Sequence, residues 1–169
     1  MLKIAKFEFV SQERFIEDYC SIFGGEEQAA RQAYGKLQLP RRATSGSAGY
    51  DFFSPVSFCL APGEQIMLPT GIRVRMQNGW VLQCFPRSGL GFKFRLQLNN
   101  TVGIIDSDYY GSDNEGHIFC KLLNDSREGK TVQLAAGQGY MQGIFLPFGI
   151  VEDDDAEALR NGGFGSTTK

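Results

Sequence analysis

The sequence lacks several features that would assign it to a special class of protein. Its 169 residues contain no CxxC pair, and the four cysteines (Cys20, Cys59, Cys84 and Cys120) lie far apart. A chain of this length folds without disulfides, so we expect reduced thiols in a cytoplasmic protein. No apolar run approaches the length of a membrane span, and we expect no signal peptide. The formal net charge of −2 excludes the strongly basic surface of a nucleic-acid-binding protein.

Direct metal ligands are also scarce. The sequence holds no dense cluster of metal-binding side chains and a single histidine, His117. No partner for His117 is evident in the sequence, and we interpret it as a structural residue.

The N-terminal part combines one strand with two short helices. Residues Ile4–Val10 predict a strand. Ser11 then caps a helix whose apolar residues recur at helical spacing, and Gly24–Gly25 ends it. A second helix follows over about residues 26–34. We expect this helical insertion, residues 11–35, to pack on the outside of a larger body.

From Leu37 onward, short alternating runs between turn signals predict an all-β sandwich or barrel. Ile72–Met76 alternates apolar residues with arginines, which is typical of a half-buried strand. Gln77-Asn78-Gly79 predicts a hairpin that pairs this strand with Trp80–Phe85. Further strands are expected over residues 117–123, 131–134 and 140–148. Without repeats or a linker, residues 1–169 form a single domain.

Five short stretches carry more polar and glycine residues than folding requires. They are Ser47–Asp51, Pro86–Gly91, Asn100–Tyr109, Gly137–Phe145 and the glycine-rich tail over residues 161–168. Each is a weak signal by itself. Asp106 could cap its own turn, Tyr109 could be core packing, and the tail could be a disordered end. Their order and combination are more specific.

In this order and at these separations, the five stretches resemble the motifs of the trimeric dUTPase family, over Leu37 to Thr168. The resemblance implies a jelly-roll-like β-subunit and a homotrimer whose active sites are shared between chains. It also implies hydrolysis of dUTP to dUMP and pyrophosphate, which keeps uracil out of DNA and supplies dUMP for thymidylate synthesis.

The third stretch would carry the catalytic chemistry. A buried Ile104–Ile105 pair is expected to lead the chain out of the core to Asp106. By the resemblance, Asp106 orients and partly deprotonates the water that attacks the α-phosphorus. Tyr109 would pack under the deoxyribose and exclude a 2′-hydroxyl. A pocket that merely lacks a partner for an extra hydroxyl rejects it only ~100-fold, so steric exclusion is needed.

The same stretch would read the base. The resemblance implies that Asn100 pairs with the uracil edge, although a simple turn residue is the alternative. Main-chain groups of Gly103, Ile104 and Ile105 in the hairpin would complete the recognition of uracil. Phe119, on the strand after the hairpin, is expected to supply a further backbone contact.

The second and fourth stretches would bind the triphosphate. Arg87 offers a fixed fork of donors. Ser88 and Gly89 offer a hydroxyl and exposed backbone N–H groups. Gln142 matches a phosphate-contacting glutamine of the family.

Asp51 is the second acidic residue of interest. Mg²⁺ is expected with a triphosphate and prefers substrate oxygens and water over a cage of protein ligands. By the resemblance, Asp51 contacts this Mg²⁺ through water only, with no direct ligand from the chain. A structural hydrogen bond near a strand start is the alternative for Asp51.

The tail would form a flexible arm, residues 156–169, that closes over the site. The resemblance implies that Phe164 stacks on uracil, that Gly165 and Ser166 contact the phosphates, and that Arg160 reaches the γ-phosphate.

Three departures from the family pattern stand out. Arg160 lies one position nearer to the tail glycines than usual. Gln138 and Gly139 replace an acidic residue and an arginine. A longer hairpin loop fills residues 111–116, so the family glycine after the tyrosine could be Gly111 or Gly116.

Two alternatives remain open. A dCTP deaminase shares the fold. Deaminases resemble a pattern with proline at the position of Asp108 and phenylalanine at the position of Tyr109, and this chain has neither. The second alternative is a signalling dUTPase that binds a repressor protein. In that case the N-terminal helices and the 111–116 loop could be surfaces for a regulatory protein partner.

Overall fold

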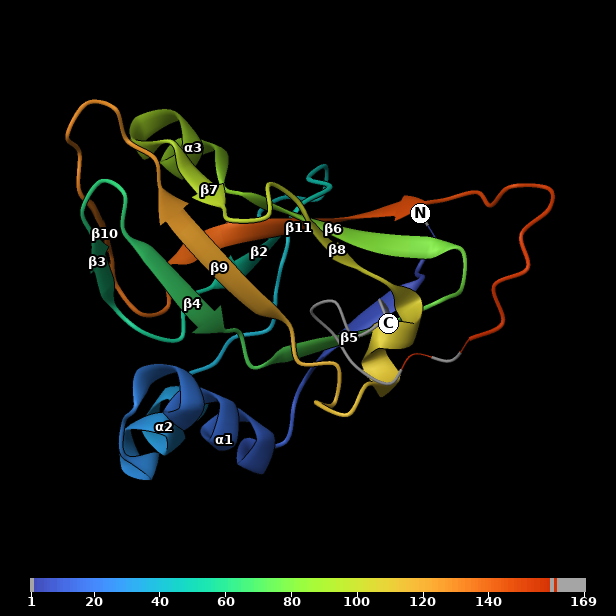
Figure 1. The fold of residues 1–169 in the computed structure, drawn as a ribbon, viewed down its shortest axis with the longest axis horizontal. Helices are drawn as coiled ribbons and strands as arrows, with labels where there is room; N and C mark the ends of the chain where they lie inside the picture. The colour runs from blue at the N-terminus through green and yellow to red at the C-terminus, as the bar shows by residue number, and fades with distance from the viewer. Residues whose placement is uncertain (1, 159, 161–169) are drawn as a thin grey trace.

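Short antiparallel strands make up most of the regular secondary structure (Figure 1). The computed structural model describes residues 2–158 and residue 160. Its strands are β1 (Ala5–Phe9), β2 (Tyr50–Phe53), β3 (Phe58–Leu60), β4 (Gln65–Pro69), β5 (Ile72–Met76), β6 (Trp80–Pro86), β7 (Leu96–Leu98), β8 (Gly103–Ile105), β9 (Phe119–Asn124), β10 (Val132–Leu134) and β11 (Gly139–Pro147). The helices are α1 (Gln12–Phe23), α2 (Glu27–Tyr34), α3 (Ser88–Phe94) and the 3₁₀ helix η1 (Ser107–Gly111).

The strands form two larger and two smaller sheets. The larger ones have the orders β2-β11-β6-β8 and β4-β9-β7, and the smaller ones are the pairs β1-β5 and β10-β3. Every pair of neighbouring strands is antiparallel. The predicted all-β, jelly-roll-like fold is confirmed.

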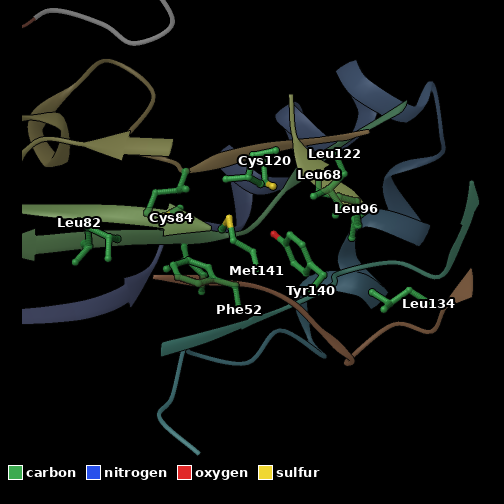
Figure 2. Close-up of a cluster of buried hydrophobic side chains, with 14 of the residues drawn as sticks. Phe52, Leu68, Leu82, Cys84, Leu96, Cys120, Leu122, Leu134, Tyr140 and Met141 are labelled. Carbon is green, nitrogen blue, oxygen red and sulfur yellow. The ribbon is translucent and has the colours of Figure 1, made fainter. Parts of the chain in front are cut away.

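Both larger sheets contribute to one continuous core (Figure 2). From the four-stranded sheet come Phe52, Leu82, Cys84, Tyr140 and Met141. From the three-stranded sheet come Leu68, Leu96, Leu98, Cys120 and Leu122. The core is therefore closed between β6 and β11 on one side and β4 and β9 on the other.

Helix α1 forms where the sequence predicts it. The Ser11 hydroxyl accepts a hydrogen bond from the Arg14 amide at 3.1 Å, and Gly24 ends the helix with a φ of 61°. Phe15 and Ile16 are the buried side chains of this amphipathic helix. Figure 1 shows α1 and α2 together at one end of the molecule, where α1 contacts β4. Of the helices in the described part of the chain, none has the length and apolarity to cross a membrane.

The predicted hairpin around Gln77-Asn78-Gly79 is wrong. Both strands exist, but β5 pairs with β1, and β6 lies between β11 and β8. Gly79, with a φ of 81°, makes the turn, yet the turn carries the chain from one sheet to another. A turn signal reports the local reversal of the chain, whereas strand partners are chosen by packing with distant segments.

Candidate active site

A cavity of about 260 Å³ opens beside strand β8 and helix η1. Eight of the predicted site residues line it: Asn100, Gly103, Ile104, Ile105, Asp106, Tyr109, Phe119 and Arg160. They come from three separate parts of the chain, namely the turn with β8 and η1, the start of β9, and residue 160. We call this cavity and its walls the nucleoside half of the candidate site, after the role that the sequence predicts for these residues.

The backbone before β8 explains how these residues are presented. The chain reverses between Leu98 and Thr101, whose amide donates to the Leu98 carbonyl at 2.8 Å and whose φ is 70°. Asn100 is left exposed at the tip of this turn. Next, Gly103 passes so close to β6 that an added Cβ would lie 3.1 Å from the Cβ of Cys84. Glycine is therefore the residue that fits this close approach.

The expectation of a buried Ile104–Ile105 pair is wrong for Ile104, which is 52% exposed. Successive residues of a strand point to opposite faces. Ile105 packs against the core, so Ile104 faces the opposite side, on the edge strand β8. Ile104 therefore forms an apolar part of the cavity wall that no other described residue of the chain covers.

Asp106 leaves β8 and precedes helix η1. Its carbonyl accepts a hydrogen bond from the Tyr109 amide at 3.2 Å, which fixes the turn into η1. The guanidinium of Arg160 donates to Oδ2 of Asp106, and its Nε donates to Oδ1 of Asp108 at 2.9 Å. The structure thus places Arg160 against two carboxylates. Its predicted contact with the γ-phosphate stays a prediction.

Tyr109 forms a rigid wall of the nucleoside half. It is only 7% exposed, and its hydroxyl donates to the His117 carbonyl at 2.7 Å. The side-chain amide of Asn114 donates to the same hydroxyl at 2.8 Å. Burial raises the pKa of Tyr109, although the Asn114 hydrogen bond acts in the opposite direction. The ring is therefore held at both its buried face and its polar tip.

Asp51, Arg87 and Gln142 meet on the other part of the four-stranded sheet. Gln142 of β11 pairs with Asp51 of β2 on one side and with Phe85 of β6 on the other. Nε of Arg87 lies 3.2 Å from Oδ1 of Asp51. We call this group, with Ser88 and Gly89, the phosphate half, again after the role that the sequence predicts for these residues.

The departure at Gly139 lies directly beside Arg87. An added Cβ at Gly139 would lie 2.7 Å from a terminal nitrogen of Arg87, and the same nitrogen donates to the Gly139 carbonyl at 3.4 Å. Glycine therefore leaves the space that the Arg87 guanidinium occupies beside Asp51. Gln138 accepts a hydrogen bond from the Ala135 amide at 2.9 Å and so closes the preceding turn.

Ser88 and Gly89 open helix α3 directly after Arg87. With Arg87, they line a second, more open cavity of about 480 Å³, which also borders Gln138 and Gly139. Gln142 is not part of this lining. Its side-chain amide donates to the Pro86 carbonyl at 3.4 Å.

The two halves lie far apart within one chain. Gly103 pairs with Cys84 and Ile105 with Leu82, so Asp106 continues along β6 toward Val81. Arg87 lies beyond the opposite end of β6. Six residues separate positions 81 and 87, which corresponds to about 20 Å along a strand. A single chain does not bring Arg87 to Asp106.

A further cavity of about 220 Å³ lies under the nucleoside half and shares Asn100, Gly103 and Phe119 with it. Cys84 and Cys120 also line this cavity. Burial raises the pKa of the Cys84 thiol to about 12 and that of Cys120 well above its usual value. These cysteines are free and act as small apolar wall residues. Nothing in their sequence spacing indicates this position.

His117 has a partner that the sequence does not reveal. It is fully buried, and its Nδ1 lies 2.6 Å from Oδ2 of Asp18, on helix α1. Within residues 2–158 and 160, no group of three or more histidine, cysteine or acidic side chains could hold a metal ion. The predicted contacts of Phe164, Gly165 and Ser166 lie outside the described residues.

The model of the dUTPase family matches residues 35–168 of this chain. A deoxyuridine 5′-triphosphate nucleotidohydrolase of Lactococcus lactis is 40% identical over 146 residues, which cover 85% of this chain and 96% of the relative. A relative of the same name from Escherichia coli is 38% identical over 138 residues, covering 77% and 87%.

Solved structures agree with this match. The crystal structure of dUTPase from Streptococcus mutans has a TM-score of 0.63 and 36% identity, covering 86% of this chain and 98% of its own. A mutant dUTPase from phage phi11 of S. aureus, described as coordinating a structural Mg(II) ion, has a TM-score of 0.64. At 19% identity, covering 92% and 98% of the two chains, it shows the fold alone. The family match and the close relatives together establish that this chain belongs to the dUTPase family.

Proposed function

We propose that this chain hydrolyses dUTP to dUMP and pyrophosphate, with the nucleoside bound in the cavity beside β8. The carrying observation is the placement of Asp106 and Tyr109 on the wall of one cavity, in a chain of the dUTPase family. In this assignment the buried ring of Tyr109 faces the deoxyribose, and the carboxylate of Asp106 lies at the exit toward the phosphates.

The base is read by the turn and the edge strand. Asn100 is exposed at the turn, and Gly103, Ile104 and Ile105 offer main-chain groups along the same wall. Phe119 lines both the nucleoside cavity and the cavity beneath it. A pyrimidine inserted between β8 and Phe119 would contact these groups at its edge.

Asp106 acts on the attacking water. Only Oδ2 is engaged by Arg160, and no described residue donates to Oδ1. Oδ1 would accept a proton from the water as its oxygen bonds to the α-phosphorus. The bond between the α-phosphorus and the bridging oxygen breaks, and pyrophosphate leaves with that oxygen.

Arg87, Ser88, Gly89 and Gln142 would hold the phosphates. Mg²⁺ prefers substrate oxygens and water to a cage of protein ligands, so phosphate oxygens and water would supply most of its ligands. Asp51, whose side chain is 20% exposed, would hold Mg²⁺ through water. When bound, Mg²⁺ would neutralise charge on the phosphates and on the leaving pyrophosphate.

A homotrimer would complete the site. The separation of about 20 Å between Asp106 and Arg87 along β6 supports a site in which each half comes from a different copy. The exposed Ile104 supports the same assembly, because a second copy would cover the edge strand. The C-terminal arm, including Arg160, Phe164, Gly165 and Ser166, would close over the combined site. We place the reaction in the cytoplasm.

The two alternatives are not favoured. The relatives and structures compared above are dUTPases, and Tyr109 holds the position where a deaminase pattern has phenylalanine. No observation of the described residues supports a regulatory protein partner.

The proposal is tested by incubating the full chain with dUTP in ¹⁸O-labelled water. We expect equal amounts of dUMP and pyrophosphate, with the label in dUMP, because attack occurs at the α-phosphorus. Label in pyrophosphate would contradict the mechanism. Ammonia release from dCTP without dUTP hydrolysis would contradict the function.

A further inference from the structure

The loop after η1 and helix α1 exceed the minimal family pattern, and they bind each other. The carboxylate of Glu115, in the loop, accepts hydrogen bonds from the Ser11 amide at 2.8 Å and from the Ser11 hydroxyl at 2.6 Å. Burial alone would raise the pKa of Glu115, but the two bonds from Ser11 outweigh it and the pKa is lowered. The loop thus anchors the first turn of α1, whose N-cap is Ser11.

A second contact joins the same two segments. The Gly71 amide donates to Nε2 of His117 at 2.8 Å, so Nδ1 carries the ring proton and donates to Asp18 at 2.6 Å. Asp18 also accepts two hydrogen bonds from Arg14. Burial would raise the pKa of Asp18, but the bonds from His117 and Arg14 outweigh it, and the pKa is lowered. Asp18 therefore fixes the orientation of the His117 ring as a charged acceptor.

His117 in turn touches both aromatic walls of the nucleoside half. Its carbonyl accepts the Tyr109 hydroxyl at 2.7 Å. Its ring lies against Phe119, with 4.5 Å between ring centroids and 42° between the planes. On the opposite side, Phe15 of α1 lies 6.2 Å from the His117 ring. His117 is thus packed between helix α1 and the walls of the cavity.

The contacts of α1 and of the loop therefore lie within the chain itself. Ser11 and Asp18 of the helix segment bind Glu115 and His117 of the loop segment, and Phe15 is fully buried. These polar side chains lie in segments outside the minimal family pattern, and they support the residues that line the cavity.

We propose that Asp18 and His117 are positioning residues that hold Tyr109 and Phe119 in place and thereby sharpen the selection of the deoxyribose sugar. This inference rests on the proposed placement of deoxyribose against Tyr109. Steric exclusion of a 2′-hydroxyl requires a wall that does not yield, and a wall residue is held by its own supporting contacts. Loss of Asp18 leaves the His117 ring held only by the Gly71 amide and by aromatic packing, which loosens Phe119 directly and Tyr109 through the His117 backbone carbonyl.

The experiment compares Asp18→Ala with Glu17→Ala in the full chain. Both carboxylates lie on α1 and pair with Arg14, but only Asp18 reaches His117. We would measure kcat and KM for dUTP and for UTP, together with the thermal unfolding midpoint. For Asp18→Ala we expect a KM for dUTP about tenfold higher and a dUTP-to-UTP ratio of kcat/KM about tenfold lower. Glu17→Ala should stay within about twofold of the parent in both quantities.

A fall in kcat by the same factor for both substrates, with unchanged KM and ratio, would overturn the inference, because it indicates only less folded protein. Equal behaviour of the two variants would also overturn it. If Asp18→Ala does not fold, Tyr109→Phe decides, since it keeps the ring and removes the hydroxyl that donates to the His117 carbonyl and accepts from Asn114. A lower ratio supports the inference and an unchanged ratio overturns it. An unaltered chain that fails to hydrolyse dUTP would instead overturn the proposed function, and this inference with it.

Discussion

The nucleoside half and the phosphate half are built in opposite ways. Tyr109 is 7% exposed and is bonded at its hydroxyl by two neighbours, whereas the Arg87 side chain is 44% exposed and pairs with one carboxylate. The nucleoside half is supported from behind by His117 and by helix α1. The phosphate half stands on strand ends and the start of a short helix.

The difference follows from what each half must recognise. An extra hydroxyl group on the sugar is excluded by shape, so the walls must be buried and rigid. A triphosphate is recognised by its charge, which acts over longer distances and tolerates an open, adaptable surface. We expect substitutions in the nucleoside half to change selectivity and turnover, and those in the phosphate half to change affinity.

The largest effect is expected at the exit of the nucleoside half. Asp106→Asn should lower kcat by at least about a hundredfold, because the water loses its general base. The dissociation constant for dUTP should change much less. Asp108→Asn is the matched control, since Asp108 also binds Arg160 but is expected to take no part in catalysis. Equal losses in both variants, measured by pyrophosphate release, would show that contact with Arg160 matters and not the base.

The phosphate half should respond in KM. Arg87→Ala removes the charged fork beside Asp51, and we expect KM for dUTP to rise by roughly tenfold to a hundredfold, with a smaller change in kcat. Arg87→Lys keeps the charge and should recover part of the loss. Steady-state kinetics at low and high salt would measure this. A dominant loss of kcat in Arg87→Ala would remove the contrast between the halves.

The support behind the nucleoside half is tested by two glycines. Gly116 has a φ of 71°, and an added Cβ would lie 2.7 Å from Cα of Tyr110, whereas Gly111 has nothing within 4 Å. Gly116→Ala should therefore reduce the free energy of unfolding by about 1–3 kcal/mol. Gly111→Ala should change it by less than about 0.5 kcal/mol. Urea denaturation measures both, and equal effects would show that the loop does not need this conformation.

The smallest expected effect is a pH dependence at Asp18. Its pKa is lowered from 3.8 in the folded chain, so its stabilising contribution is fully present above that value and is lost as pH falls through the folded pKa. The difference in free energy of unfolding between the parent and Asp18→Asn should therefore be largest above about pH 5 and should shrink below pH 3.8. A constant difference across this range would show that Asp18 is not stabilised as a charged acceptor.

The same contrast explains what the sequence could predict. The predicted residues of the nucleoside half line one cavity in the structure. Most of them belong to one continuous stretch, residues 100–109, and only Phe119 and Arg160 come from other parts of the chain. The strand from Ile72 to Met76 and the Ser11 cap were predicted from local patterns and are confirmed. Local periodicity and capping need only neighbouring residues.

The unpredicted features depend on distant segments. The partner of β5 is β1, about 65 residues away, and no turn signal could indicate it. Asp18 and His117 are 99 positions apart in the sequence. The exposure of Ile104 depends on which face of β8 meets the core. Each of these is fixed by tertiary packing, which a single sequence does not show.

Each complete active site would combine the nucleoside half of one copy with the phosphate half of another copy. Asp106→Asn impairs one half and Arg87→Ala the other, and the two variants would be co-expressed and assayed for pyrophosphate release at a dUTP concentration below the parent KM, where each separate variant turns over slowly. If sites are shared in a randomly mixed trimer, about a quarter of them combine two intact halves, so the mixture should recover about a quarter of the parent activity. Activity no higher than that of the separate variants would contradict the claim.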